Sequence, residues 1–307
     1  MNARAPFAGT SAFGAEVLRG LLDAGVEVPL VLSQPDRPAG RRRVPTPPPV
    51  AALAVELGLP LVQPERAIDA LEALRAVAPR AIAICAYGQL LPAELLALCP
   101  WLNLHPSLLP RWRGAAPIER ALMAGDAETG VAIMETVAAL DEGPIVSVDP
   151  IPLSDDADAA FVEAEALRLG VPALVRAIAS ATEGGLVTAP QAAAGATYAA
   201  KLERADRLID PQADGVAATA NRIRALRPHI GALLALDDEP CTVWRACPAP
   251  DALAPGAIAA TADRLVVGLA DGALEIVELQ APGRRALDAP AWLRGRRALP
   301  TRAARPA

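Results

Sequence analysis

The sequence predicts an α/β protein with a doubly wound, mostly parallel sheet of Rossmann-like type, followed by a small OB-like β-barrel domain. In the first half of the chain, short apolar runs alternate with helical patterns, which is typical of a parallel sheet with helices on both faces. Beyond Pro240 short apolar runs follow closely on one another, separated by turn residues such as Asp271-Gly272, which favours an antiparallel barrel. A length of 307 residues suits two domains. We therefore expect a first domain over residues 1–185, a linker over 186–205 and the barrel domain over 206–307.

The spacing of apolar residues assigns the elements, and glycines mark helix ends. Gly25 and Gly58 follow the first two helical patterns, where glycine commonly closes a helix. We expect helices over residues 15–24, 50–57, 68–77, 92–98, 117–124 and 213–225, and two further helices within 159–182. We expect strands over residues 28–33, 59–62, 81–86, 101–105, 131–135 and 145–150, and barrel strands over 242–246, 256–260, 264–269 and 274–279. Residues 34–49, rich in proline and arginine, are expected to form a loop.

Three unusual loops follow strands of the predicted sheet. They span residues 34–43, 87–91 and 103–110. In open α/β sheets, ligands bind beyond the carboxyl ends of the strands. The sequence therefore predicts a site at the edge of the sheet where these three loops meet.

Composition excludes several classes of protein. The four cysteines form no close pair and only two histidines are present, so neither a metal site nor a disulfide framework is expected. The N-terminal residues show no signal-peptide pattern, and no run of 18 uncharged apolar residues occurs, so we expect a cytoplasmic protein that does not bind membranes. The net charge is −6, yet the last 26 residues hold seven arginines against one acid. A local basic surface can bind phosphates despite a negative total.

Asn103 and His105 form the first candidate for chemistry. Alternation along a strand places them on the same side of the strand end. In acyl transfer to an amine, an amide donor can stabilise the oxyanion of the tetrahedral intermediate, and an imidazole can move protons near neutral pH. A single histidine at a strand end is more often structural, but the neighbouring asparagine, the sheet-edge position and the Pro-Arg-rich sequence around it favour a catalytic role.

Two further segments have chemical potential. Asp141, just before Glu142-Gly143-Pro144, either shapes a turn or supplies the carboxylate that an Asn–His pair lacks. Three consecutive arginines, residues 41–43, either form a charged surface loop or contact phosphates. The sequence contains none of the motifs typical of dinucleotide-binding, P-loop, serine-hydrolase or zinc-protease sites.

Taken together, four segments resemble the family of formyltetrahydrofolate-dependent formyltransferases, and among them the methionyl-tRNA formyltransferases. Residues 103–118 match the Asn-X-His and SLLPRWRGAAPI block of that family, and residues 34–40 match its QPDRPAG loop. Residues 86–92 match its AYGxxLP segment, and residues 197–202 match its TYAxKL link to the second domain. The Asn-His-Asp trio is typical of the whole superfamily, whereas the other segments point to the tRNA enzymes.

The resemblance implies a catalytic formyltransferase domain followed by a tRNA-binding OB-like domain. It implies 10-formyltetrahydrofolate as formyl donor and methionyl initiator tRNA as acceptor, no metal, and a monomer. The implied catalytic residues are Asn103, His105 and Asp141. The implied folate-binding residues are Ser107, Leu108, Leu109 and Pro110, and the residues implied to contact the tRNA are Arg37, Arg41, Arg42 and Arg43.

The sequence departs from the family pattern in two places that bear on the site. Few apolar residues precede Ala8-Gly9-Thr10, so a short or frayed first strand is expected. After Asp141, where the family usually reads Thr-Gly-Asp, this chain reads Glu142-Gly143-Pro144, and Pro144 lacks a backbone donor. Two alternatives therefore stay open: a sugar-nucleotide formyltransferase with the same chemistry on an amino sugar, and a non-catalytic relative that binds folate or RNA.

Overall fold

The structure, a computed structural model, describes residues 3–39 and 43–306. The chain divides into two compact units, each discontinuous in sequence. The first comprises residues 1–115, 129–152 and 163–199, and the second comprises residues 116–128, 153–162 and 200–307. The limits of the three regions expected from the sequence stay a prediction.

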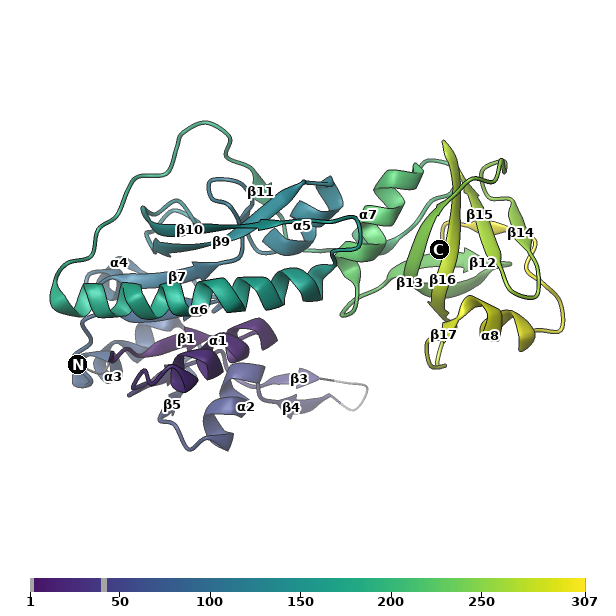
Figure 1. Cartoon of the computed structure of the whole chain (residues 1–307). Helices are drawn as coiled ribbons and strands as arrows, with labels where there is room; N and C mark the ends of the chain where they lie inside the picture. Colours follow the sequence, from purple (N-terminus) through teal and green to yellow (C-terminus); the bar gives the residue numbers. More distant parts are fainter. Residues whose placement is uncertain (1–2, 40–42, 307) are drawn as a thin grey trace. The chain divides into compact units, whose positions relative to one another are not determined.

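A sheet in the order β10-β9-β7-β6-β1-β2-β5 forms the centre of the first unit (Figure 1). Neighbouring strands from β5 to β7 run parallel, whereas β9 runs antiparallel to β7. The strands are β1 (Phe7–Gly9), β2 (Val31–Leu32), β5 (Leu61–Val62), β6 (Ile82–Cys85), β7 (Trp101–His105), β9 (Glu128–Glu135) and β10 (Ile145–Pro152). The predicted α/β class with a mostly parallel sheet is confirmed. β1 is as short as expected, but it is a buried central strand.

Helices cover both faces of this sheet because consecutive strand residues point to opposite sides. Ala83 of β6 packs with α1, α2 and α6, whereas Ile82 and Ile84 pack with α3 and α4. The helices are α1 (Ala12–Asp23), α2 (Pro49–Glu56), α3 (Leu71–Ala76) with the preceding 3-10 turn η1 (Ala67–Ala70), α4 (Ala93–Leu96) and α6 (Ala159–Glu183). The segments that follow the parallel strands β1, β6 and β7 therefore begin at one common edge of the sheet.

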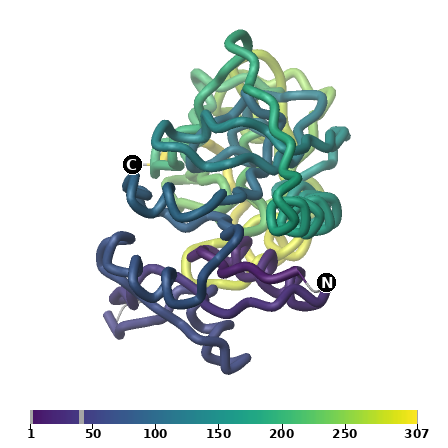
Figure 2. Tube along the Cα trace, turned by 90° about the vertical axis from the view of Figure 1, so that its left-hand side faces the viewer, coloured from purple at the N-terminus to yellow at the C-terminus, as the bar shows by residue number. Residues whose placement is uncertain are grey.

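The expectation of two helices within residues 159–182 is wrong. α6 is one continuous helix, seen along its length in Figure 1 and nearly end-on in Figure 2, with Pro172 inside it. Proline removes the backbone bond to the carbonyl four residues earlier. The helix continues because a stripe on both sides of Pro172, including Ala166 and Leu174, is buried against the sheet.

The expectation of an irregular loop at residues 34–49 is also wrong in part. β3 (Arg37–Ala39) and β4 (Val44–Thr46) pair as an antiparallel hairpin, with Pro38 opposite Pro45. Proline cannot donate to a ladder, but a two-stranded ribbon has free edges that tolerate it. Arg41 and Arg42, two of the predicted tRNA contacts, lie outside the described residues.

The second unit contains a nearly closed antiparallel barrel, as predicted. Its main strand order is β14-β15-β16-β13-β12-β18, and β17 pairs with β16. A bridge between Ala257 and Arg302 joins the two ends of this order. The strands are β12 (Ala232–Leu236), β13 (Glu239–Ala249), β14 (Ile258–Ala260), β15 (Leu265–Leu269), β16 (Gly272–Gln280), β17 (Leu287–Asp288) and β18 (Ala303–Ala304). β12 was not predicted, because a run of five apolar residues that follows a helix can belong either to a strand or to a helix.

Helices α5 (Pro117–Ala124), α7 (Val216–Leu226) and α8 (Ala289–Arg294) and the 3-10 turn η2 (Arg204–Arg207) complete the second unit. Arg120 of α5 forms a two-pronged ion pair with Asp206, in which each guanidinium–carboxylate distance is 2.8 Å. Arg120 lowers the pKa of Asp206. Among the described residues, no helix is long and apolar enough to cross a membrane.

Replacing Pro172 by alanine should stabilise the first unit. Alanine restores the missing backbone donor in the helix interior, and we expect the free energy of unfolding to rise by about 1–3 kcal/mol. Pro49→Ala is the matched control, since Pro49 is exposed at the start of α2, where proline costs nothing. Urea unfolding followed by circular dichroism measures both changes. An equal effect of the two substitutions would contradict a single strained helix.

Candidate active site

Strand β7 brings Asn103 and His105 to one carboxylate. Its neighbours are β6, where Ile84 pairs with Asn103, and β9, where Ala132 pairs with His105. Asn103 Nδ2 donates to Asp141 Oδ1 at 3.4 Å, and His105 Nδ1 lies 3.8 Å from Asp141 Oδ2. The prediction that Asn103 and His105 share a side is therefore confirmed, and the structure adds the carboxylate that the sequence could not place beside them.

The Asp141 carboxylate is fixed by the backbone. The N–H of Gly114 donates to Asp141 Oδ2 at 2.8 Å. Asp141 itself has φ +49°, in the left-handed region that costs a non-glycine residue about 1 kcal/mol, although aspartate tolerates it better than most. The carboxylate is therefore presented by a backbone conformation that surrounding contacts must maintain.

The protonation pattern of His105 follows from its partners. The side chain is buried, and Nε2 lies 2.9 Å from the carbonyl oxygen of Trp112. Because a carbonyl oxygen only accepts, Nε2 carries a proton. In the neutral imidazole the basic lone pair is then on Nδ1, the nitrogen that faces Asp141. Nδ1 is thus the nitrogen that can accept a proton, and the negative carboxylate of Asp141 lies 3.8 Å from it.

The unusual Glu142-Gly143-Pro144 turn fits the structure. A side chain at Gly143 would overlap the carbonyl oxygen of Glu135, so the backbone passes too close to β9 for any other residue. The carbonyl of Pro144 accepts from Glu135 N at 2.9 Å. At this position only the backbone carbonyl of Pro144 takes part in a hydrogen bond, so the missing N–H of proline is not needed. The turn therefore keeps Asp141 in place although the chain departs from the family pattern.

The predicted folate-binding residues lie in the loop after β7. The hydroxyl of Ser107 donates to the carbonyl of Arg111 at 2.7 Å, and Ser107 is buried. Leu109 packs with Ala132 and Met134. The side chains of Ser107 and Leu109 therefore shape the loop, and a folate contact by Ser107, Leu108, Leu109 and Pro110 stays a prediction.

Two of the three loops expected at the sheet edge are joined there. The carbonyl of Tyr87 accepts from Thr10 Oγ1 at 2.7 Å and from Gln34 Nε2 at 2.9 Å. The third loop follows β7, which runs parallel to β6. Leu90, in the same segment as Tyr87, is 87% exposed.

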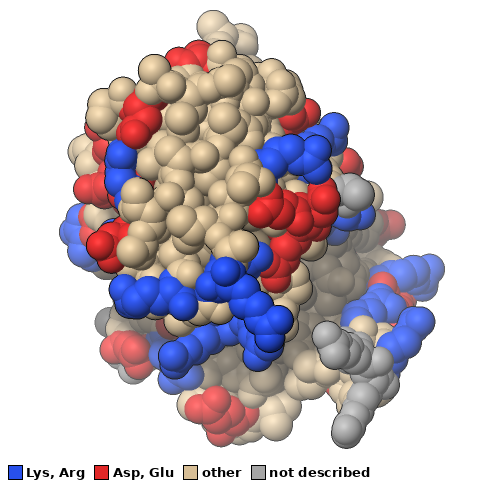
Figure 3. All heavy atoms as spheres, turned by 90° about the vertical axis from the view of Figure 1, so that its right-hand side faces the viewer, with Lys and Arg blue, Asp and Glu red and all other residues tan. Residues whose placement is uncertain are grey.

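Of the predicted tRNA-contacting arginines, the described ones are accessible. Arg37 forms an exposed ion pair with Glu65 at 3.2 Å, and Arg43, directly before β4, is exposed. Exposed pairs of this kind contribute little and exchange easily for a phosphate. In the second unit, arginine side chains form a band on the barrel surface (Figure 3). The exposed arginines in the final segment of the chain are Arg284, Arg285, Arg294, Arg297, Arg302 and Arg305.

The residues that hold Asp141 in place, Gly114 and Gln191, were not predicted from the sequence. β8 (Arg113–Gly114) pairs with β11 (Tyr198–Ala199), which places the Gly114 N–H beside Asp141. Gln191 donates to the carbonyls of Asp141 and Gly143, each at 2.8 Å. The match of residues 197–202 to a family segment was a signal that this region matters, but it did not indicate contact with Asp141.

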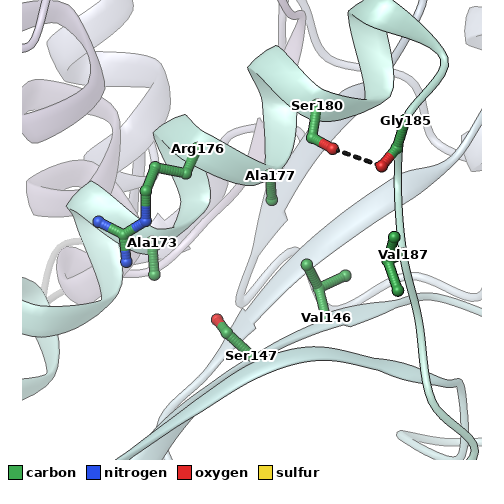
Figure 4. Close-up of a pocket in the computed structure, with 8 residues that line it drawn as sticks. All are labelled: Val146, Ser147, Ala173, Arg176, Ala177, Ser180, Gly185 and Val187. Carbon is green, nitrogen blue, oxygen red and sulfur yellow. Dashed lines mark hydrogen bonds between the residues drawn. The ribbon is translucent and has the colours of Figure 1, made fainter.

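Other features of the first unit lie outside this cluster. A pocket of about 260 Å³ between β10 and α6 is lined by small and apolar residues together with Arg176 (Figure 4), and none of its lining residues belongs to the Asn103–His105–Asp141 cluster. Burial raises the pKa of the Cys85 thiol to about 12, so it is not a nucleophile at neutral pH.

Within residues 3–39 and 43–306, no group of three His, Cys, Asp or Glu side chains is arranged to hold a metal ion.

An amide, an imidazole and a carboxylate meet at the edge of a doubly wound sheet, and this combination of groups suits acyl transfer. Comparison with known proteins narrows this class. Residues 5–178 match the model of the formyl transferase family, and residues 201–297 match that of the formyl transferase C-terminal domain. The chain is 42% identical to the methionyl-tRNA formyltransferase of Aromatoleum aromaticum, over 94% of this chain and 93% of the relative. It is also 42% identical to that of Bordetella petrii, over 95% and 96%.

Solved structures share the fold at low identity. HypX from Aquifex aeolicus in complex with tetrahydrofolic acid superposes with a TM-score of 0.67 at 18% identity, over 95% of this chain and 47% of HypX, so the chain spans about half of HypX. The sugar 3N-formyl transferase WlaRD has a TM-score of 0.62 at 14% identity, over 93% of this chain and 99% of WlaRD. With its two matching domains and its near full-length relatives, the chain belongs to the methionyl-tRNA formyltransferase family.

Replacing Gly143 by alanine should damage formyl transfer. The added methyl group forces the turn away from Glu135, and Asp141 moves with it. Misplacing a catalytic group by about 1 Å costs about 100-fold in rate, so we expect a fall in kcat of that order. Gly185→Ala is the control, because its nearest atom would be 3.8 Å away. Steady-state kinetics of both variants decide the point, and a Gly143→Ala enzyme as active as Gly185→Ala would contradict it.

Proposed function

We propose that this chain transfers the formyl group of 10-formyltetrahydrofolate to the free amino group of methionyl initiator tRNA. The observation that carries the proposal is the convergence of Asn103 and His105 on the carboxylate of Asp141, in a chain 42% identical to methionyl-tRNA formyltransferases over 94% of its length. We propose that it acts as a cytoplasmic monomer, and that the catalytic cluster needs no metal.

In the proposed mechanism, the amine of the acceptor attacks the formyl carbon, a carbon–nitrogen bond forms, and a tetrahedral intermediate results. His105 Nδ1 takes the proton that the attacking nitrogen loses, because Nε2 already donates to Trp112. Asp141 stabilises the resulting imidazolium across 3.8 Å. The proton then passes to the folate nitrogen as its bond to the formyl carbon breaks, which gives a formylated amine and tetrahydrofolate.

Asn103 has the second role in this mechanism. Its amide has two N–H groups, and one of them reaches Asp141 at 3.4 Å. The other is available to donate to the oxygen that becomes negative in the tetrahedral intermediate. A preorganised donor of this kind typically contributes about 3–4 kcal/mol to transition-state stabilisation.

RNA binding is proposed for the basic surfaces of both units. In the first unit these are Arg37 and Arg43 on the β3–β4 hairpin, together with Arg41 and Arg42, which lie outside the described residues. In the second unit they are the arginines on the barrel surface in Figure 3. Contacts of arginine with phosphate are strong and independent of sequence, which fits an acceptor stem.

The sugar-nucleotide alternative shares the chemistry but not the acceptor. The sugar formyltransferase WlaRD is 14% identical to this chain, against 42% for the methionyl-tRNA formyltransferases. One assay with methionyl initiator tRNA and an amino-sugar nucleotide as rival acceptors separates the two functions. We expect formylation of the tRNA alone. Transfer only to the amino sugar would overturn the proposal, and binding of folate and tRNA without transfer would indicate the non-catalytic relative.

Asn103→Ala should lower kcat about 100- to 1,000-fold, because one oxyanion donor is lost. The KM values for the two substrates should change little, since the donor acts mainly in the transition state. Asn221→Ala makes the same chemical change on α7 of the second unit and should retain activity. A folded Asn103→Ala enzyme with near-normal kcat would exclude the proposed role.

Removing positive charge from the β3–β4 hairpin should weaken tRNA binding. We expect an Arg37→Ala, Arg43→Ala enzyme to have a raised KM for tRNA, an unchanged KM for folate, and a salt dependence of tRNA binding reduced by about one unit for each lost phosphate contact. Arg168→Ala on α6, which breaks only a surface pair with Glu165, is the control. Unchanged salt dependence would show that the hairpin does not contact phosphates.

A further inference from the structure

The side-chain amide of Gln191 connects two parts of the site. Nε2 donates to the carbonyls of Asp141 and Gly143, each at 2.8 Å. Oε1 accepts from Arg113 Nε at 3.1 Å and from Arg113 Nη2 at 2.8 Å. An amide has two donors and one acceptor oxygen, so every polar group of Gln191 is used. The two carbonyls it binds flank the turn that presents the Asp141 carboxylate.

Arg113 fixes the orientation of that amide. Because its guanidinium donates twice to Oε1, the amide cannot rotate to present its oxygen to the two carbonyls. The remaining nitrogen, Nη1, lies 2.9 Å from Glu142 Oε1. The neighbouring residue, Gly114, holds the Asp141 carboxylate through its own N–H. The same short strand therefore controls the carboxylate directly and the backbone of Asp141 through Gln191.

We propose that Gln191 and Arg113 are positioning residues that set the placement of Asp141 beside His105. The inference rests on the proposed function for its kinetic consequence, but its structural content does not require a substrate. Asp141 has a left-handed backbone conformation and Gly143 packs against Glu135, so the turn needs donors for its two carbonyls to keep this path. Gln191 supplies both donors.

Gln191→Met tests this role, because methionine has similar length and no hydrogen-bonding amide. Gln212→Met is the matched control: Gln212 also donates to a backbone carbonyl, that of Pro255, and has no part in the site. Arg113→Lys is a second variant that keeps the positive charge and loses the two-pronged contact with Gln191. If Gln191→Met does not fold, Arg113→Lys still tests the proposed role of Gln191.

The first measurement uses the imidazole NMR signals of the full-length protein without substrate. The chain has two histidines, His105 and His229, so the spectrum carries its own internal reference. We expect Gln191→Met and Arg113→Lys to move the His105 signals and leave those of His229 in place, and Gln212→Met to move neither. His105 signals identical to those of the unmodified protein in both Gln191→Met and Arg113→Lys would overturn the proposal.

The second measurement is a double-mutant cycle on formylation of methionyl-tRNA. We expect Gln191→Met to lower kcat about 10-fold or more, with little change in either KM. In an Asp141→Asn background the same substitution should lower kcat less than about twofold, because Gln191 acts through Asp141. An equal loss in both backgrounds would show a general structural effect and contradict positioning. Absence of tRNA formylation by the unmodified chain would contradict the proposed function instead, and the NMR result would still decide the role of Gln191.

Discussion

The hydrogen bond from the Gly114 N–H to Asp141 Oδ2, at 2.8 Å, joins strand β8 to a turn 27 residues further along the chain. It places a carboxylate where Asn103 and His105 converge on it, although Asp141 itself lies in a turn outside any strand or helix. β8 can offer that N–H only because it pairs with β11, which follows α6. The Asn103–His105–Asp141 cluster therefore depends on β8 and β11 as well as on β7, the strand that carries Asn103 and His105.

The burial of His105 determines how its imidazole can take part in proton transfer. His105 is 5% exposed, and its Nε2 proton is committed to a backbone carbonyl, so the tautomer is determined by the fold. In the proposed mechanism, the charge that develops on Nδ1 faces a fixed carboxylate in a poorly solvated site, where electrostatic interactions are stronger than in water. The Glu142-Gly143-Pro144 turn preserves this geometry through backbone contacts, which explains how the chain departs from the family pattern without losing the position of Asp141.

The sequence predicted those features that depend on local periodicity. The parallel sheet, the barrel and the shared side of Asn103 and His105 all follow from alternation or apolar spacing. Features that depend on contacts between residues far apart in the chain could not be predicted from the sequence. Two helices were expected within residues 159–182, but burial on both sides of Pro172 outweighs the backbone bond lost there, and α6 is continuous. Gln191 is an ordinary polar residue in sequence, and its value comes only from the two carbonyls that the fold brings to it.

Formyl transfer is proposed to take place at the Asn103–His105–Asp141 cluster. A crystal structure of the protein with a formyl-bearing folate would show where the formyl group binds. We expect the formyl oxygen to lie about 2.7–3.1 Å from Asn103 Nδ2 and His105 Nδ1 to face the position from which the amine attacks. A formyl group bound away from both Asn103 and His105 would rule out this placement of the reaction.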